Sequence, residues 1–222
     1  MKIVIAIDSF KGSATSSELN AATKAGVLEA LPEANVVSFE IADGGEGTLS
    51  TLHAGLGGDW VTVETVDLLE RPCEASYLLV GGQAFIESAS VVGIDKITPS
   101  PETFEKATTK GLAKLFEDAV AQGAQEIYLT LGGTGTSDGG RGLFEALNGK
   151  VSEVKLYGIS DVTNVYAGPE GYSIFFGKQK GGTSGQIAAQ NESALAFAAK
   201  MKTERGIDLQ KIPGTGAAGG LG

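Results

Sequence analysis

The first fifty residues alternate between strand-like and helix-like segments, and this alternation constrains the fold more than any other feature of the chain. Residues 2–7 form an apolar, β-branched run that is typical of a buried parallel strand. The capping-box pattern of residues 15–18 then predicts a helix that ends before Pro32. Residues 36–42 predict a second strand, and residues 43–47 a loop that leads into a second helix. This order of elements indicates an α/β layer fold.

The middle of the chain follows a different pattern. Residues 60–66, 74–80 and 84–89 are short strand-like runs separated by turn residues, without a long helix between them. This spacing favours antiparallel pairing over crossover connections. We therefore predict a three-layer α/β/α fold with a parallel sheet, plus a second α/β subdomain that contains antiparallel strands and begins near Gly58.

Helix signals return at Ser100, a candidate N-cap with Pro101 at the first helical position. Apolar residues at helical spacing then predict a core-facing helix that ends near Gly123: Leu112, Leu115, Phe116, Ala119 and Val120. Residues 127–131 predict another buried strand, which leads into a glycine-rich loop. A last helix is expected over residues 184–205, with four side chains pointing inward: Ile187, Leu195, Ala198 and Met201.

Composition narrows the classes of function. The 222 residues include 27 acidic and 17 basic ones, and the net charge of −10 argues against nucleic acid or an anionic membrane as the main partner. The single cysteine, Cys73, and the single histidine, His53, exclude cysteine-rich zinc sites and leave little scope for histidine-based catalysis. Acid–base chemistry must then rely on carboxylates or lysines. The N-terminal residues do not form a signal peptide, and we expect a cytoplasmic protein.

The 33 glycines, well above the usual share of ~7%, concentrate in loops that follow predicted strands. The first of these loops holds Asp8, Ser9, Lys11, Gly12 and Ser13. Ligands of α/β proteins bind beyond the carboxyl ends of strands, where a lysine can neutralise a phosphate and a serine can donate to it. A solvated loop with an exposed lysine explains this segment equally well when it is taken alone.

The second loop combines Asp43 and Glu46 with Gly44, Gly45 and Gly47. Carboxylates at the start of a helix can act simply as caps, because acids favour that end. Three glycines in four residues are costly for capping alone, and they fit a place where the backbone approaches a ligand.

The third loop, residues 132–140, joins a predicted strand to a helix. Its N–H groups could form an anion-binding concavity, to which five residues would contribute: Gly132, Gly133, Thr134, Gly135 and Thr136. The loop lacks the Walker A pattern and does not fit a dinucleotide fingerprint, which disfavours a dinucleotide-dependent oxidoreductase. Asp138 in the same loop could cap the following helix, bind a metal or act as a base.

A fourth pair of segments places Asp161 and Asn164 after one predicted strand and Lys180 in a later loop. Lysines in loops are usually surface residues. Together, however, anion cradles, lysines and carboxylates without histidine suggest phosphoryl transfer, which needs positioning and charge neutralisation more than covalent help.

Taken in order, these segments resemble the glycerate kinase type I family. The matching stretches are D-S-F-K-G-S at 8–13, A-D-G-G-E-G-T at 42–48, the loop of residues 132–140, residues 161–164, residues 176–181 and G-T-G-A-A-G-G-L-G at 214–222. The loop of residues 132–140 is similar to the family's G-G-S-A-T-N-D-G-G. The likeness spans the whole chain.

The resemblance implies ATP-dependent, Mg²⁺-assisted phosphorylation of D-glycerate, a small-molecule substrate, with 2-phosphoglycerate favoured over 3-phosphoglycerate as the product. It also implies a site between two α/β domains, with residues 1–57 the first part of a Rossmann-like domain and residues 58–222 an inserted domain. The oligomeric state is left open. The candidate catalytic residues are Lys11, Asp43, Asp138 and Lys180, with Asp43 and Asp138 as Mg²⁺ ligands and with Glu46, Asp161 and Asn164 as supporting polar contacts.

The chain departs from the family's pattern in three respects. Family members are longer and continue past the G-A-A-G-G-L-G motif, so the resemblance predicts that the part completing the first domain is absent. At Gly149-Lys150 a helix meets a strand where we expect an intervening segment, and Val165 and Lys178 stand where the family has proline. A non-catalytic anion- or nucleotide-binding fragment of such a kinase is therefore the alternative function.

Overall fold

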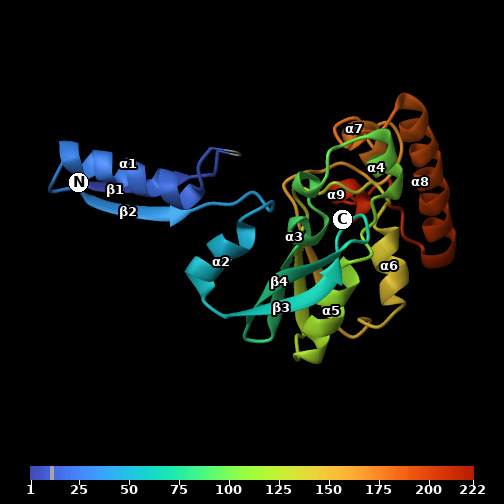
Figure 1. The fold of residues 1–222 in the computed structure, drawn as a ribbon, viewed down its shortest axis with the longest axis horizontal. Coiled ribbons are helices and arrows are strands. Elements are labelled where there is room, and N and C mark those ends of the chain that lie inside the picture. Colours follow the sequence, from blue (N-terminus) through green and yellow to red (C-terminus); the bar gives the residue numbers. More distant parts are fainter. Residues whose placement is uncertain (11–12) are drawn as a thin grey trace.

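A computed structural model describes residues 1–10 and 13–222 of the chain (Figure 1). The strands are β1 (Lys2–Ile7), β2 (Asn35–Glu40), β3 (Asp59–Val66), β4 (Pro72–Val80), β5 (Gln83–Glu87), β6 (Glu126–Thr130) and β7 (Lys155–Ile159). The helices are α1 (Ser16–Ala30), α2 (Thr48–Leu56), α3 (Ser88–Val92), the 3₁₀ helix η1 (Ile94–Lys96), α4 (Pro101–Lys106), α5 (Leu112–Ala121), α6 (Arg141–Leu147), α7 (Tyr172–Phe176), α8 (Ser184–Arg205) and α9 (Ala217–Gly220). The predicted α/β class is confirmed.

β1 and β2 form a parallel pair against which α1 packs. The predicted capping box starts α1, since Thr15 and Glu18 each accept a hydrogen bond from the other's backbone N–H. The prediction of a buried first strand is wrong, because in β1 only Ile5 is buried. The described sheet has just two strands and one covering helix, so most of its side chains face solvent. Figure 1 shows this unit beside the larger body, which the chain reaches through α2.

The second sheet has five strands in the order β3-β4-β5-β6-β7. The pairs β3–β4 and β4–β5 are antiparallel, as predicted, whereas β5, β6 and β7 run parallel to one another. Consequently the carboxyl ends of β5, β6 and β7 lie along one edge, where α/β proteins bind ligands. α2 packs against β4 and β5 although it precedes Gly58, and the domain boundary near that residue stays a prediction.

Two cores cover the two faces of this sheet because successive strand residues point to opposite sides. On one face, α5 packs its apolar stripe against Tyr77, Ile86 and Ile127. On the other face, Leu49 of α2 packs with Leu78 and Phe85. The loops at the carboxyl edge are therefore supported by packed elements on both sides of the sheet.

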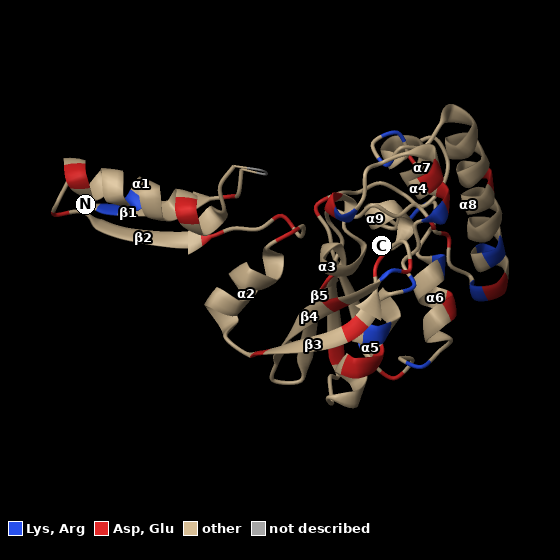
Figure 2. Cartoon of the chain, in the orientation of Figure 1, with Lys and Arg blue, Asp and Glu red and all other residues tan. Residues whose placement is uncertain are grey.

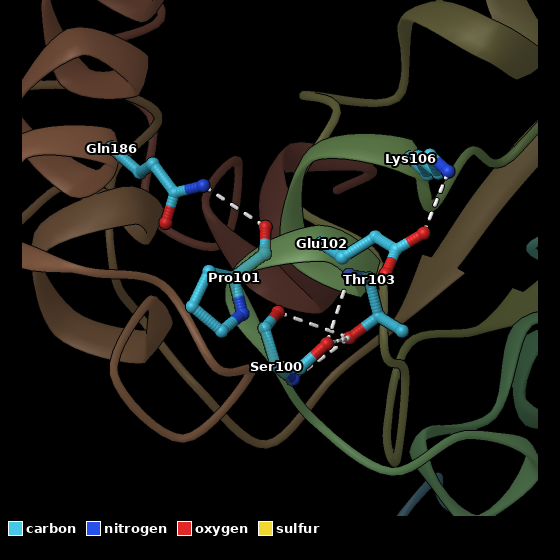
Figure 3. Close-up of polar contacts among 6 residues, drawn as sticks. All are labelled: Ser100, Pro101, Glu102, Thr103, Lys106 and Gln186. Carbon is cyan, nitrogen blue, oxygen red and sulfur yellow. Dashed lines mark hydrogen bonds and ion pairs between the residues drawn. The ribbon is translucent and has the colours of Figure 1, made fainter.

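The expected helical region after Ser100 forms two helices, α4 and α5, with a break between them. Ser100 caps α4 by accepting from the Thr103 N–H, and Pro101 occupies the first turn, both as predicted (Figure 3). The break follows from tertiary contacts: Thr109 turns toward Asp138 of a distant loop, and a Cβ on Gly111 would collide with the Val66 carbonyl. The predicted apolar face of α5 is confirmed.

α8 has the predicted bounds, Ser184–Arg205, and buries Ala194 and Ala198. The prediction that Leu195 points inward is wrong, because this side chain is exposed. Figure 2 shows Lys and Arg interspersed among Asp and Glu on α4, α5 and α8. Among the residues that the structure describes, none of the helices has the length and apolar character needed to span a bilayer.

Candidate active site

A cavity of about 270 Å³ lies at the carboxyl edge of the five-stranded sheet. It brings together loops that are far apart in the sequence: the loop before α2, the loop after β6, the loop after β7 and the segments that carry Lys180 and Gly219. The residues that line it are Asp43, Ile94, Leu131, Gly132, Gly133, Thr134, Asp161, Val162, Phe176, Gln179, Lys180, Ala218 and Gly219. Six of the predicted site residues therefore share one cavity.

The loops before α2 and after β6 touch through their glycines. The Gly132 N–H donates to the Gly44 carbonyl at 2.9 Å. A Cβ on Gly132 would lie 2.7 Å from both the Cα and the N of Gly45, which is closer than any side chain permits. Glycine at position 132 thus allows the backbone that carries Asp43 to reach the cavity wall.

Lys180 supplies the cationic group of the cavity. Its side chain is 2% exposed, and its Nζ donates to the Thr136 carbonyl at 2.5 Å and to Thr134 Oγ1 at 3.3 Å. Burial lowers the pKa of the Lys180 ammonium to about 7, while the negative charge of Asp138 opposes this effect. An amine whose pKa lies near neutrality gains charge when an anion binds beside it, so this lysine suits an anion site.

Neighbouring glycines place the Lys180 segment. Gly181 lies against the backbone of Pro99 and Ser100, where a Cβ would collide. At the same end of α4, the Gln186 amide of α8 donates to the Pro101 carbonyl at 2.9 Å (Figure 3). On the opposite side, a Cβ on Gly219 would collide with the Thr136 carbonyl and lie 3.0 Å from Lys180 Nζ. The G-A-A-G-G-L-G motif, to which sequence reasoning assigned no role, therefore forms part of the cavity wall.

Asp138 has a different environment from Asp43. Its Oδ2 accepts from Thr109 N–H and Oγ1, both at 2.8 Å, from Gly142 N–H at 3.1 Å and from Thr108 Oγ1 at 3.3 Å, and its Oδ1 accepts from Gly140 N–H at 3.1 Å. These donors belong to the α4–α5 connection and the start of α6. Asp138 lines a separate polar cavity of about 480 Å³, so the loop of residues 132–140 does not present its aspartate beside Asp43.

Asp43 and Asp161 are the two carboxylates of the site cavity. Asp43 Oδ1 accepts from the Gly45 N–H at 2.8 Å, and Asp161 is exposed. One half-buried and one exposed carboxylate form a donor set that Mg²⁺ can use, because this ion binds through one or two carboxylates and keeps several waters. No group of three or more metal-ligating His, Cys, Asp or Glu side chains occurs within residues 1–10 and 13–222.

A second cavity, of about 560 Å³, also borders the loop of residues 43–47, through Glu46 and Gly47. Asp8, Ser9 and Ser13 line it from the loop after β1, and Glu46 lines it from the loop before α2. Lys11 and Gly12, both predicted site residues, lie outside the described residues. Ten of the predicted site residues are therefore divided between two cavities that border one loop.

Three predicted residues support the loops rather than line the site cavity. The Asn164 amide donates to the Glu170 carbonyl at 3.2 Å, and the Gly135 N–H donates to the Val92 carbonyl at 2.8 Å. Thr136 contributes its carbonyl to Lys180, while its buried Oγ1 makes no hydrogen bond within the described part of the chain. His53, which sequence reasoning kept out of the chemistry, packs its ring 5.4 Å from that of Trp60.

Comparison with known proteins identifies the family. The chain matches the glycerate kinase family over residues 3–153 and again over residues 147–222. It belongs to that family. Among curated proteins it is similar to the glycerate kinase of Halalkalibacterium halodurans, with 33% identity over 99% of this chain and 66% of the relative. It is 32% identical to the glycerate 2-kinase of Escherichia coli over 100% of this chain and 67% of the relative.

The fold agrees with this family. A crystal structure described as that of a glycerate kinase 2 from Salmonella typhimurium LT2 matches with a TM-score of 0.83 and 31% identity, over 100% of this chain and 68% of that one. The chain spans about two thirds of the length of the family members it matches.

The family match also bears on the expected gap near residue 150. The two matched ranges, 3–153 and 147–222, meet at the junction of α6 and β7. The alignment with the Escherichia coli protein extends over 258 residues, more than the 222 of this chain. The relatives therefore carry segments without a counterpart here, and the break in the family match lies where the Gly149-Lys150 junction predicts one.

Proposed function

We propose that this protein transfers the γ-phosphoryl group of ATP to D-glycerate and that 2-phosphoglycerate is the product. Family membership supports the substrate class, since relatives carry the names glycerate kinase and glycerate 2-kinase. The observation that carries the proposal is the cavity in which a buried lysine, glycine-loop backbone and two carboxylates converge. Its volume of about 270 Å³ suits a three-carbon hydroxy acid and the phosphoryl group it receives.

In this proposal a hydroxyl oxygen of glycerate bonds to the γ-phosphorus while the bond from phosphorus to the β–γ bridging oxygen breaks, and ADP leaves. Asp43 accepts the hydroxyl proton, because it is the carboxylate that the glycine contacts place in the cavity wall. Lys180 neutralises an anionic group, either the glycerate carboxylate or the transferring phosphoryl group. Lys11 is the second candidate cation. Asp138 stays a candidate catalytic residue, and its hydrogen bonds also fit a role in holding the α4–α5 connection to the start of α6.

Mg²⁺ would supply charge neutralisation for the triphosphate, as in other phosphoryl transfers. Asp43 and Asp161 are the residues that would hold it, because both carboxylates line the site cavity. Since ATP is a cytoplasmic substrate, we expect the reaction to take place in the cytoplasm.

The test is incubation of the 222-residue protein with ATP, Mg²⁺ and D-glycerate. We expect ADP to form only when D-glycerate is present, and ³¹P NMR of the product to show 2-phosphoglycerate. Formation of 3-phosphoglycerate would refute the assigned position of transfer alone. Absence of glycerate-dependent ADP would refute the kinase proposal for this chain.

The second candidate is a binding module without turnover, favoured by the share of about two thirds that the chain covers in its relatives. Isothermal titration with D-glycerate and with Mg²⁺-ATP separates the two candidates. A module would bind at least one of these ligands without producing ADP.

A further inference from the structure

Glu87 is a buried carboxylate that the mechanism above does not use. It is the last residue of β5 and is 7% exposed. We infer that Glu87 is a positioning residue for the reaction: its carboxylate caps α2 from the neighbouring sheet and thereby holds the Asp43-bearing loop at the cavity. This inference rests on the proposed function.

The geometry is that of a helix cap supplied by a distant element. The N–H of Gly47 donates to Glu87 Oε1 at 3.3 Å, and the N–H of Leu49 donates to Oε2 at 3.2 Å. Each carboxylate oxygen thus serves a separate amide at the start of α2. These residues are separated by about forty positions in the chain, so the contact ties the loop to the sheet.

α2 needs this outside cap because its own N-terminus provides none. Its N-cap residue is Gly47, in the left-handed conformation with φ 87°, and no side chain of the helix makes a capping hydrogen bond. The first N–H groups of a helix require acceptors, and a carboxylate also interacts favourably with the positive end of the helix dipole.

The environment of Glu87 both opposes and favours the charged form of its carboxyl. Desolvation raises the pKa of the Glu87 carboxyl, the amides of Leu49 and Gly47 lower it, and the negative charge of Glu46 raises it. Burying a carboxylate near another acid costs free energy unless hydrogen-bond donors compensate for the lost water. The backbone N–H groups at the start of α2 are those donors.

The consequence reaches Asp43 through a short stretch of backbone. Asp43 precedes Gly47 by four residues, and two hydrogen bonds attach this stretch to other elements: the Gly132 N–H, in the loop after β6, donates to the Gly44 carbonyl, and the Gly47 N–H donates to Glu87 of β5. Removing the second attachment leaves the helix end of the loop free to move. Because a displacement of about 1 Å can lower a rate 100-fold, this freedom should affect turnover.

The first test uses amide hydrogen exchange in wild-type protein and in Glu87→Gln. Glutamine has one acceptor oxygen and one NH₂ group, so at least one of the two amides must face a donor. We expect exchange at the Gly47 or Leu49 amide to accelerate at least tenfold in the variant. Unchanged exchange at both amides would overturn the inference, whatever the protein's activity.

The second test compares Glu87→Gln with Tyr77→Phe as a matched control. Tyr77 on β4 is also buried, and its hydroxyl donates to Asp118 at 2.9 Å in the core that packs against α5, away from the site cavity. Both variants lose a buried hydrogen bond and should lose similar stability in urea unfolding. We expect kcat for D-glycerate phosphorylation to fall at least tenfold in Glu87→Gln, with KM changed less than threefold, and to stay within twofold in Tyr77→Phe.

The outcomes separate the two proposals. A wild-type protein without glycerate-dependent ADP refutes the proposed function, while the exchange measurement still decides whether Glu87 holds the loop. An active wild type with equal kcat in Glu87→Gln and Tyr77→Phe refutes the positioning role and leaves the proposed function intact.

Discussion

The loops of residues 43–47 and 132–140 look alike in the sequence but differ in what their aspartates contact. Each is rich in glycine, follows a strand and leads into a helix, and each contains one aspartate. Asp43 lines the site cavity, whereas Asp138 accepts five hydrogen bonds from two segments and lies in another cavity.

The difference shows that two loops of similar composition can place their aspartates in different environments. A carboxylate whose lone pairs are occupied by backbone N–H and hydroxyl donors stabilises the fold. The loop of residues 132–140 still contributes to the site, but it does so through backbone and Thr134. One loop thus contributes the Asp43 side chain to the cavity, and the other contributes mainly its backbone.

The largest expected effect is the loss of turnover in Asp43→Asn. If Asp43 accepts the hydroxyl proton, kcat should fall by about 10²- to 10⁴-fold, because the amide cannot act as a base. Glycerate-dependent ADP release measures kcat, and the urea midpoint should change little. A kcat within threefold of wild type would remove Asp43 from the mechanism.

Asp138→Ala should act mainly on stability. Losing the acceptor leaves the N–H groups of Thr109 and Gly142 without their partner, and we expect a loss of roughly 2–4 kcal/mol in the free energy of unfolding. Urea denaturation followed by circular dichroism measures this value. Glu145→Ala, at an exposed position of α6, is the control and should stay within about 0.5 kcal/mol. If Asp138→Ala changes the free energy of unfolding as little as the control does, the hydrogen bonds of Asp138 do not stabilise the fold, and the proposed difference between the two loops is wrong.

Gly132→Ala tests the contact between the two loops. The added methyl would lie 2.7 Å from the Gly45 backbone, so we expect a loss of about 1–3 kcal/mol in unfolding free energy and a lower kcat. Gly26→Ala is the control, because this glycine lies inside α1 with open space around it and should stabilise the protein by roughly 0.5–1 kcal/mol. If both substitutions stabilise, the loops are not in tight contact.

The last expected effect is a pH dependence of anion binding through Lys180. The free amine has a pKa of about 7, and a bound anion favours its charged form. Above pH 7 binding therefore requires proton uptake, and the Kd for D-glycerate should rise with pH by up to about tenfold per pH unit. Titration calorimetry between pH 6 and 9 measures this slope, which Lys180→Met should lack. A flat profile in the wild type would contradict the role of Lys180.

The same residue shapes the dependence of stability on pH. The folded pKa of about 7 lies below the ordinary value of 10.5, so between these limits the unfolded chain binds more protons than the folded one. The contribution of Lys180 should therefore raise the free energy of unfolding as pH increases from 7 toward 10.5. Below pH 7, where Lys180 is charged in the folded protein, its burial should lower the free energy of unfolding by the full amount. Lys180→Met should show no such pH-dependent loss.

Local sequence patterns predicted elements well where short-range chemistry decides them. The capping box at Thr15, the N-cap at Ser100, the end of α1 before Pro32 and the bounds of α8 depend on neighbouring residues, and all are confirmed. The break between α4 and α5 was missed, since it depends on Thr109 bonding to Asp138 about thirty positions away. Glu87 was missed as well, because it reads as an ordinary residue of a short strand and its partners are amides of another element.

By itself, the sequence determined the α/β class, the family resemblance and the set of loops that could hold a ligand, because strand and helix periodicity, caps and glycine content are local properties. Only the tertiary structure decided which loop side chains face a common cavity, that Lys180 is buried, and that Asp138 is saturated with donors. These facts depend on long-range packing at the carboxyl edge of β5, β6 and β7. Packing sets the desolvation and the hydrogen-bond partners of each charged group, and no local pattern encodes either of them.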